Sequence, residues 1–205
     1  MGDPRNLKKK YDTPSHPWQG ERIKQEKELM VKYGLKNKKE VWRAQSYLRT
    51  LRAQARTLSA KIRTENKQAL KESDLLLKRC VSLSFLTEGA PLQDVLAIQI
   101  ETLLSRRLQT LVYTKGLAQT PMQARQMIKH GHIVLKGRRT TIPGMLVHRG
   151  DERFIEYDDS SPFTNEEHSM RPKATVADGA EGAPSQVPEK VKIGTNAEEV
   201  KQDGR

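Results

Sequence analysis

The sequence predicts an α+β protein with a helical N-terminal domain, a small module of two helices and a short antiparallel sheet, and a disordered acidic tail. Three observations lead to this fold class. Apolar residues recur at helical spacing from residue 21 to about residue 86. Short strand-like runs and glycine turns occupy residues 131–157. From residue 158 onward, large apolar residues nearly vanish, and Pro, Gly, Ala, Ser and Glu dominate.

The 205-residue chain is basic, but its charge is unevenly distributed. Residues 1–157 hold 31 Lys and Arg against 15 Asp and Glu, a net charge of +16. Residues 158–205 hold 6 against 10, a net charge of −4. A basic folded part favours a polyanionic partner, and nucleic acid is the commonest one. A surface charged only for solubility would mix the two signs more evenly.

Composition excludes several classes of protein. The single cysteine, Cys80, rules out a disulfide framework within the chain and a zinc site built of cysteines, and it is expected to be a small buried residue. No apolar run reaches the roughly 18 residues of a membrane span, and no apolar stretch follows the basic N-terminus as in a secretory signal. We therefore expect a soluble intracellular protein with no membrane partner.

Residues 1–20 are predicted to form a basic extended arm. Prolines interrupt helical structure there, and Arg5 and Lys8–Lys10 add positive charge of the kind that lies along phosphate backbones. The alternative is a frayed terminus, but Tyr11 and Trp18 favour docking.

Residues 21–100 are predicted to form the helical domain. A short helix over residues 21–33 ends at Gly34, and Asn37 with Glu40 resembles a capping box at the start of the next helix. That helix carries one apolar stripe: Val41, Ala44, Leu48, Leu51, Ala55, Leu58 and Ile62. A further helix over residues 65–86 has the expected core residues Leu70, Leu76, Leu77, Cys80, Leu83 and Leu86.

Four arginines lie beside the apolar stripe of the long helix, within a sector of about 60°. A helix of this kind packs by one side and presents guanidinium groups, which bind phosphate through paired hydrogen bonds, on the adjoining side. The stripe contains no acidic residue, so salt bridges would have to come from other elements. We expect nucleic-acid contacts from Arg49, Arg52 and Arg56, with Arg63 in the same sector.

Residues 94–157 contain the remaining elements. Helical spacing predicts one helix from Asp94 to Tyr113, ended by Gly116, and a second helix from Thr120–Pro121 to Gly131. In the second helix, Ala124, Met127 and Ile128 are expected to pack inward. Strands are predicted near residues 132–136, 138–148 and 153–157, with turns at 137, 143–144 and 149–152.

A family resemblance is carried by residues 105–139, which read SRRLQTLVYTKGLAQTPMQARQMIKHGHIVLKGRR. The pattern R-L, G-L-A, A-R-x-x-I and H-G-H-I before a glycine turn resembles the RNA-binding module of the S-four family of small-subunit ribosomal proteins. Residues 92–96 (LQDVL), 142–145 (IPGM), 154–157 (FIEY) and 11–14 (YDTP) resemble archaeal and eukaryal members. The resemblance therefore covers about residues 5–157.

The resemblance implies an RNA-binding module at residues 101–157, and the polar composition predicts a disordered tail at 158–205. It implies a structural constituent of the small ribosomal subunit that is a primary binder of small-subunit ribosomal RNA, acts early in assembly of the subunit body and contributes to translational accuracy. It also implies a cytoplasmic, ribosomal location, contacts with ribosomal proteins five and possibly twelve, no cofactor and no enzymatic activity. The family's RNA contacts map onto Arg107, Arg125, Gln126, Lys129, His130, Lys136, Arg138 and Arg139.

The charge pattern points to the same surface independently. Arg125 and Lys129 are four residues apart on one helix, and the turn Lys136–Arg139 adds three positive side chains. Folded RNA is read mainly through its backbone and shape, so the binding should depend on salt. Gln109 and Lys136 depart from the family, which commonly has Asp and Asn there, and this bears on turn geometry. No cysteine precedes Cys80, so the zinc cluster of some bacterial members is not expected.

Other functions fit the sequence less well. His130 and His132 flank a glycine but have no cysteine to complete a metal site, so an RNA contact is preferred. An RNA-modifying enzyme would need a separate catalytic domain, and residues 21–90 are too few and too basic. A non-ribosomal translation factor could share the module but need not carry the arginine-flanked helix. A DNA-binding regulator would need a dimer interface and a recognition helix.

Overall fold

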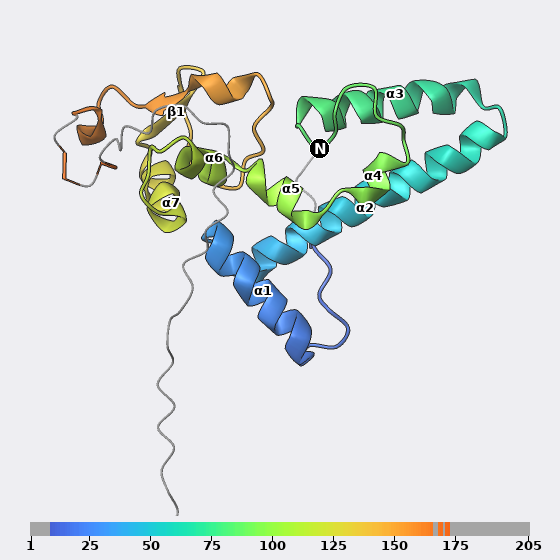
Figure 1. Cartoon of the computed structure of the whole chain (residues 1–205), viewed down its shortest axis with the longest axis horizontal. Coiled ribbons are helices and arrows are strands. Elements are labelled where there is room, and N and C mark those ends of the chain that lie inside the picture. The colour runs from blue at the N-terminus through green and yellow to red at the C-terminus, as the bar shows by residue number, and fades with distance from the viewer. Residues whose placement is uncertain (1–8, 166–167, 170, 173–205) are drawn as a thin grey trace, which may run out of the picture. The chain divides into compact units, whose positions relative to one another are not determined.

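The computed structural model describes residues 9–165, 168–169 and 171–172, and it confirms the α+β class (Figure 1). Helices α1 to α5 form a helical part, residues 20–105. The remaining described elements form the C-terminal module, residues 106–165, with a three-stranded antiparallel sheet. Within the described residues, no helix is both long and apolar enough to cross a membrane.

The described part of the N-terminal arm, residues 9–19, docks onto the long helix α2 (Lys38–Arg63). The backbone N–H of Asp12 donates to Ser46 Oγ at 3.0 Å, and the Tyr11 ring centroid lies 6.1 Å from that of Trp42. The sequence favours a docked arm over a frayed terminus, and the structure confirms docking of residues 9–19. The surface they contact is helix α2 of the same protein. Residues 1–8 lie outside the described part.

Helix α1 (Gly20–Tyr33) ends at Gly34, which adopts the left-handed backbone conformation with φ 59°. The side chain of Glu26 is buried between α1 and α2, where its carboxylate accepts a hydrogen bond from Trp42 Nε1 at 3.0 Å. Arg22 and Lys38 each lie 3.5 Å from that carboxylate, so the buried charge is compensated from both helices. The apolar stripe of α2 is confirmed: its residues from Val41 to Leu58 are buried, and Ile62 is half-buried.

Helix α3 (Lys67–Ser82) folds back along α2 (Figure 1). Leu76, Cys80 and Leu83 are buried as predicted. Leu70 was predicted to lie in the core, and this is wrong, because Leu70 is 50% exposed. Asn66 caps the helix by accepting from the backbone N–H of Gln68 at 3.0 Å. Ala69, rather than Leu70, is the buried residue in the first turn of α3.

The single helix expected over residues 94–113 is wrong, because the chain forms three short helices there. These are α4 (Asp94–Ala97), α5 (Ile100–Ser105) and α6 (Leu108–Thr114). At the first break, the carbonyl of Ile98 accepts a hydrogen bond from Arg52 Nη2 at 2.5 Å. At the second break, the backbone N–H of Leu108 donates to the carbonyl of Met145 at 2.8 Å. The breaks let the apolar residues of this segment face two different cores.

The C-terminal module combines α6 and α7 (Pro121–His130) with strands β1 (Ile133–Leu135), β2 (Arg138–Arg139) and β3 (Ile155–Tyr157). The strand order is β2-β1-β3. The strand predicted over 138–148 is short, because the carbonyls of Pro143 and Met145 accept hydrogen bonds from the first turn of α6 instead. The last strand starts two residues later than predicted, because η1 (Asp151–Phe154) is a 3-10 turn.

The disorder predicted from residue 158 is wrong for residues 158–165, which include the 3-10 helix η2 (Pro162–Thr164). The Phe163 ring packs edge-on against His132, with centroids 4.9 Å apart, and also contacts Tyr157 and the second core. Phe163 alone thus supplies the apolar contact that orders this segment, which is otherwise polar in composition. Residues 173–205, most of the predicted tail, lie outside the described residues.

Two hydrophobic cores follow one another along the chain. The first is built by residues from Tyr33 to Leu104 and the second by residues from Leu108 to Ile155. The change from one core to the other falls a few residues beyond the boundary predicted at residue 101.

We expect Leu104→Ala to lower the free energy of unfolding by about 3 kcal/mol, because Leu104 is fully buried in the first core and truncation leaves a cavity. Urea unfolding followed by circular dichroism measures this loss. Leu75→Ala, on the exposed side of α3, is the control and should change stability by less than about 0.5 kcal/mol. Equal effects of the two substitutions would contradict the assignment of this core.

Candidate nucleic-acid interface

Helix α7 is held in place by its cap and by its apolar face. Thr120 Oγ1 accepts from the backbone N–H of Gln123 at 3.1 Å, and Gln123 Oε1 accepts from the backbone N–H of Gln119 at 2.7 Å. Ala124, Met127 and Ile128 are buried as predicted. The remaining face of α7 is therefore presented to solvent with a defined orientation.

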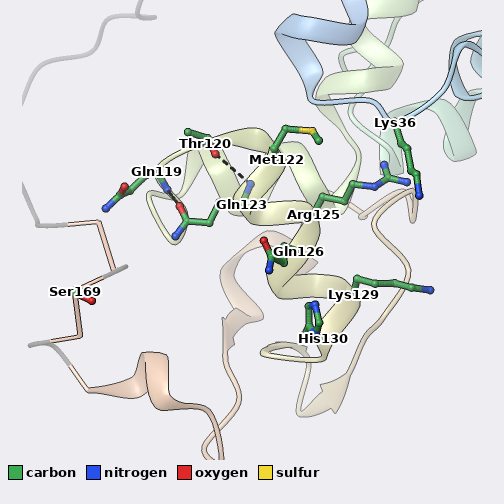
Figure 2. Close-up of a pocket in the computed structure, with 10 residues that line it drawn as sticks. All are labelled: Lys36, Gln119, Thr120, Met122, Gln123, Arg125, Gln126, Lys129, His130 and Ser169. Carbon is green, nitrogen blue, oxygen red and sulfur yellow. Dashed lines mark hydrogen bonds between the residues drawn. The ribbon is translucent and has the colours of Figure 1, made fainter.

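A hollow of about 750 Å³ lies along this face of α7 (Figure 2). Most of the side chains that line it are polar or basic, and they come from α7, from the turn before it, from the α1–α2 turn and from the C-terminal segment. They are Lys36, Gln119, Thr120, Met122, Gln123, Arg125, Gln126, Lys129, His130 and Ser169.

The predicted site residues Gln126, Lys129 and His130 are exposed on this face. Lys36 was missed by the sequence analysis, since it belongs to a lysine-rich turn that only the tertiary structure brings beside α7. Within the described residues, the side chains of Lys36, Gln126 and Lys129 form no hydrogen bond or ion pair with protein. Their polar groups are available to a ligand.

The predicted site residues Arg107 and Arg125 are instead bound to Glu40. Arg107 Nη2 lies 2.5 Å from Glu40 Oε2, and Arg125 Nη2 lies 2.8 Å from Glu40 Oε1. Arg107 is only 7% exposed, so its side chain joins parts of the protein and is turned away from a ligand surface. Arg125 is partly exposed and lines the hollow, but its guanidinium is already paired.

Glu40 therefore has a different role from the one its sequence position suggests. No side-chain hydrogen bond caps α2 at Asn37, so the predicted capping box is wrong. Burial by itself would raise the pKa of Glu40, but hydrogen bonds from Arg125 and Arg107, with their positive charges, outweigh it and lower the pKa below 4.5. The carboxylate is thus held ionised between the helical part and the C-terminal module.

Gln109 makes a second connection between these parts. Its side chain is fully buried, and Nε2 lies 2.8 Å from the carbonyl of Gly34, 2.9 Å from that of Pro121 and 3.2 Å from that of Tyr33. A Cβ at Gly34 would lie 2.7 Å from the Pro121 side chain. Gln109, which stands where the family commonly has Asp, thus lies at a tight contact between the end of α1 and the start of α7.

The β1–β2 turn carries three of the predicted site residues, and they differ in whether their side chains are paired with other protein groups. Lys136 adopts φ 53°, and its Nζ lies 2.6 Å from the Asp151 carboxylate. Arg139 Nε donates to the carbonyl of Gly131 at 2.6 Å, and its guanidinium lies 3.4 Å from Asp158. Arg138 is exposed, and its side chain has no protein partner in the part of the chain that the structure describes.

The arginines of α2 also divide into those whose guanidinium groups bind protein groups and those that remain exposed and unpaired. Arg49 pairs with Asp12 of the arm at 2.7 Å, and Arg52 is partly buried with its hydrogen bond to Ile98. Arg56 and Arg63 are exposed and make no ion pair among the described residues. The sector of four arginines therefore presents two unpaired guanidinium groups.

The two histidines at the end of α7 lie close together, with ring centroids 6.3 Å apart. His132 Nδ1 is 3.0 Å from Ser161 Oγ. Burial lowers the pKa of His132, and the positive charges of His130 and Arg139 lower it further, against the opposing effect of Asp158. Among the residues that the structure describes, no group of three or more His, Cys, Asp or Glu side chains could hold a metal ion.

Comparison with known proteins gives both a domain match and relatives that align over most of their length. The S4 domain family matches residues 106–152. Small ribosomal subunit protein uS4 of Thermoplasma acidophilum is 51% identical over 171 residues, which cover 83% of this chain and 86% of that protein. The uS4 proteins of Picrophilus torridus (51% identity, 83% and 93% coverage) and Methanococcus maripaludis (49% identity, 85% and 97% coverage) are also similar. All three organisms are archaea.

We expect Glu40→Gln to lower the free energy of unfolding by about 3 kcal/mol at neutral pH, because Arg107 would be left buried without its counter-charge. Because the folded-state pKa of Glu40 is lowered, its stabilisation is present above about pH 4.5 and is lost as the pH falls through that lowered pKa. Urea unfolding between pH 3 and pH 7 should therefore show a weaker pH dependence in the variant.

The matched control is Glu88→Gln, because Glu88 faces Arg149 at 3.6 Å but is 81% exposed. Its loss should be below about 0.5 kcal/mol. If Glu40→Gln cost no more than this control, Glu40 would not hold the two parts together.

Proposed function

Because the chain belongs to the uS4 family of small ribosomal subunit proteins, we propose that it is a structural constituent of the small ribosomal subunit and binds small-subunit ribosomal RNA. The observation that carries the proposal is about 50% identity to uS4 proteins over more than four fifths of both chains. The basic charge of residues 1–157 and the exposed cations beside α7 support it independently.

The RNA-binding surface in this proposal includes the predicted residues with available side chains. On the C-terminal module these are Gln126, Lys129, His130 and Arg138, and on the helical part they are Arg56 and the additional Lys36. Arg49 can reach RNA by exchanging its exposed carboxylate partner, Asp12, for phosphate, and the half-exposed Lys136 can do so by leaving the partly buried Asp151. Arg107, Arg125, Arg52 and Arg139 act as positioning residues, since their guanidinium groups hold protein elements together.

The family resemblance supports finer proposals about the cellular role. The protein is a primary RNA binder that acts early in assembly of the subunit body, contributes to translational accuracy and contacts ribosomal proteins five and possibly twelve. It works in the cytoplasm on the ribosome and has no catalytic activity. The two successive cores support the division into an arm, a helical domain, an RNA-binding module and a tail, with the module now extended to residue 165.

The alternatives are less well supported. An RNA-modifying enzyme or a non-ribosomal translation factor could share the S4 domain at residues 106–152. Neither would explain why similarity to uS4 proteins extends over 171 residues, most of the helical part included.

We expect the double substitution Lys129→Ala, Arg138→Ala to weaken binding to small-subunit ribosomal RNA. It should also reduce the slope of log affinity against log salt concentration by about 1.5, since each lost phosphate contact removes about 0.7 to 0.9. The control, Lys71→Ala with Lys78→Ala, removes the same charge from the exposed side of α3. Filter binding at several salt concentrations measures both, and identical slopes for the two variants would contradict the assigned surface.

The structural role itself is tested by sedimentation. The protein should remain with small ribosomal subunits through a high-salt wash, because an assembled component is buried among RNA and protein. Complete release under conditions that retain other subunit proteins would instead favour a loosely attached factor.

A further inference from the structure

We propose that the hollow beside α7 takes one unpaired nucleotide of the bound RNA. The ammonium groups of Lys36 and Lys129 contact its phosphate, and Met122 contacts its base. This inference rests on the proposed RNA-binding function and specifies which part of an RNA the site recognises.

The walls of the hollow come from two parts of the chain. Met122, Arg125, Gln126 and Lys129 are spaced three, four and seven residues from the first, so they share one face of α7. In Figure 2 the side chains of Met122, Arg125 and Lys129 extend toward the side on which Lys36 lies. Arg125 is held there by its ion pair with Glu40, which fixes the wall between the two lysines.

The polar groups of the hollow divide into occupied and available ones. Thr120 and Gln123 are engaged in capping α7, and Arg125 is paired with Glu40. The available groups in the described part include two ammonium groups, on Lys36 and Lys129, and the amide of Gln126. Two cations suit a phosphate, and an amide can both donate to and accept from a base edge.

The apolar contribution distinguishes this site from a simple phosphate patch. Met122 is 55% exposed although it lies among cationic and polar side chains. Its polarisable thioether favours contact with a flat aromatic ring. A nucleotide supplies the phosphate and the flat ring together in one unit.

The exposed thioether in the hollow favours an unpaired nucleotide over a helical stem, because its contact needs an accessible base. The hollow, with a volume of about 750 Å³, has room for one nucleotide with its phosphate. Bases become accessible to side chains mainly in loops, bulges and ends, where they leave the stack. The hollow therefore binds an unpaired nucleotide within or beside an RNA stem, while the surrounding cations bind the phosphate backbone of that stem.

The test compares two blunt RNA duplexes of about 16 base pairs, identical except for one bulged 2-aminopurine ribonucleotide. We expect the protein to bind the bulged duplex about fivefold more tightly, and the fluorescence of the bulged base to change on binding. Met122→Ala should remove most of that preference while leaving the affinity for the paired duplex nearly unchanged. Lys36→Ala should weaken the binding of both duplexes, and that of the bulged duplex more strongly. The controls Met145→Ala and Lys71→Ala, at exposed positions outside the hollow, should retain it.

Three outcomes are decisive. Equal affinity for the bulged and paired duplexes, with ribosomal RNA still bound tightly, would overturn the nucleotide site and leave the proposed function intact. An abasic bulge that binds as tightly as the 2-aminopurine bulge would overturn it as well, because the site would then be reading only the phosphate. Failure to bind any of these RNAs, ribosomal RNA included, would overturn the proposed function itself.

Discussion

The carboxylate of Glu40 is the interaction on which the arrangement of the molecule depends. It lies in the first turn of α2 and binds Arg107, between α5 and α6, and Arg125 on α7. Arg107 is deeply buried, so it needs a counter-charge. Removing Glu40 from it would leave a buried charge unpaired, which costs several kcal/mol of stability. Glu40 thus forms the buried ionic connection between the helical part and the C-terminal module.

Neutral contacts give this ionic connection its geometry. Gln109 donates to carbonyls at the end of α1 and at the start of α7, and Gly34 lets the backbone approach Pro121 closely. As a result, the turn that follows α1 carries Lys36 to the hollow beside α7. The surface offered to RNA is therefore composite: neither part contains all of it, and its shape depends on the contacts between them.

Local patterns in the sequence predicted much of the fold but could not identify partners across it. The periodicity of α2 and the cap of α7 predicted both helices, because these signals act within a few residues. The segment 94–113 has helical spacing throughout, yet it bends twice, since its residues serve two cores. Charge type predicted a basic surface, but it could not show that Arg52 and Arg107 turn inward or that Lys36 lies beside α7. Those outcomes depend on residues far away in the chain.

The central claim is that the helical part and the C-terminal module bind RNA as one surface, and a double-mutant cycle between Lys36→Ala and Lys129→Ala tests it most directly. The affinity for a bulged RNA duplex would be measured for the wild type, both single variants and the double variant. If both lysines act on one nucleotide, the double variant loses less than the sum of the two single losses, by about 0.5 kcal/mol or more. Strictly additive losses would contradict the claim, because they would mean that the two residues bind RNA at separate places.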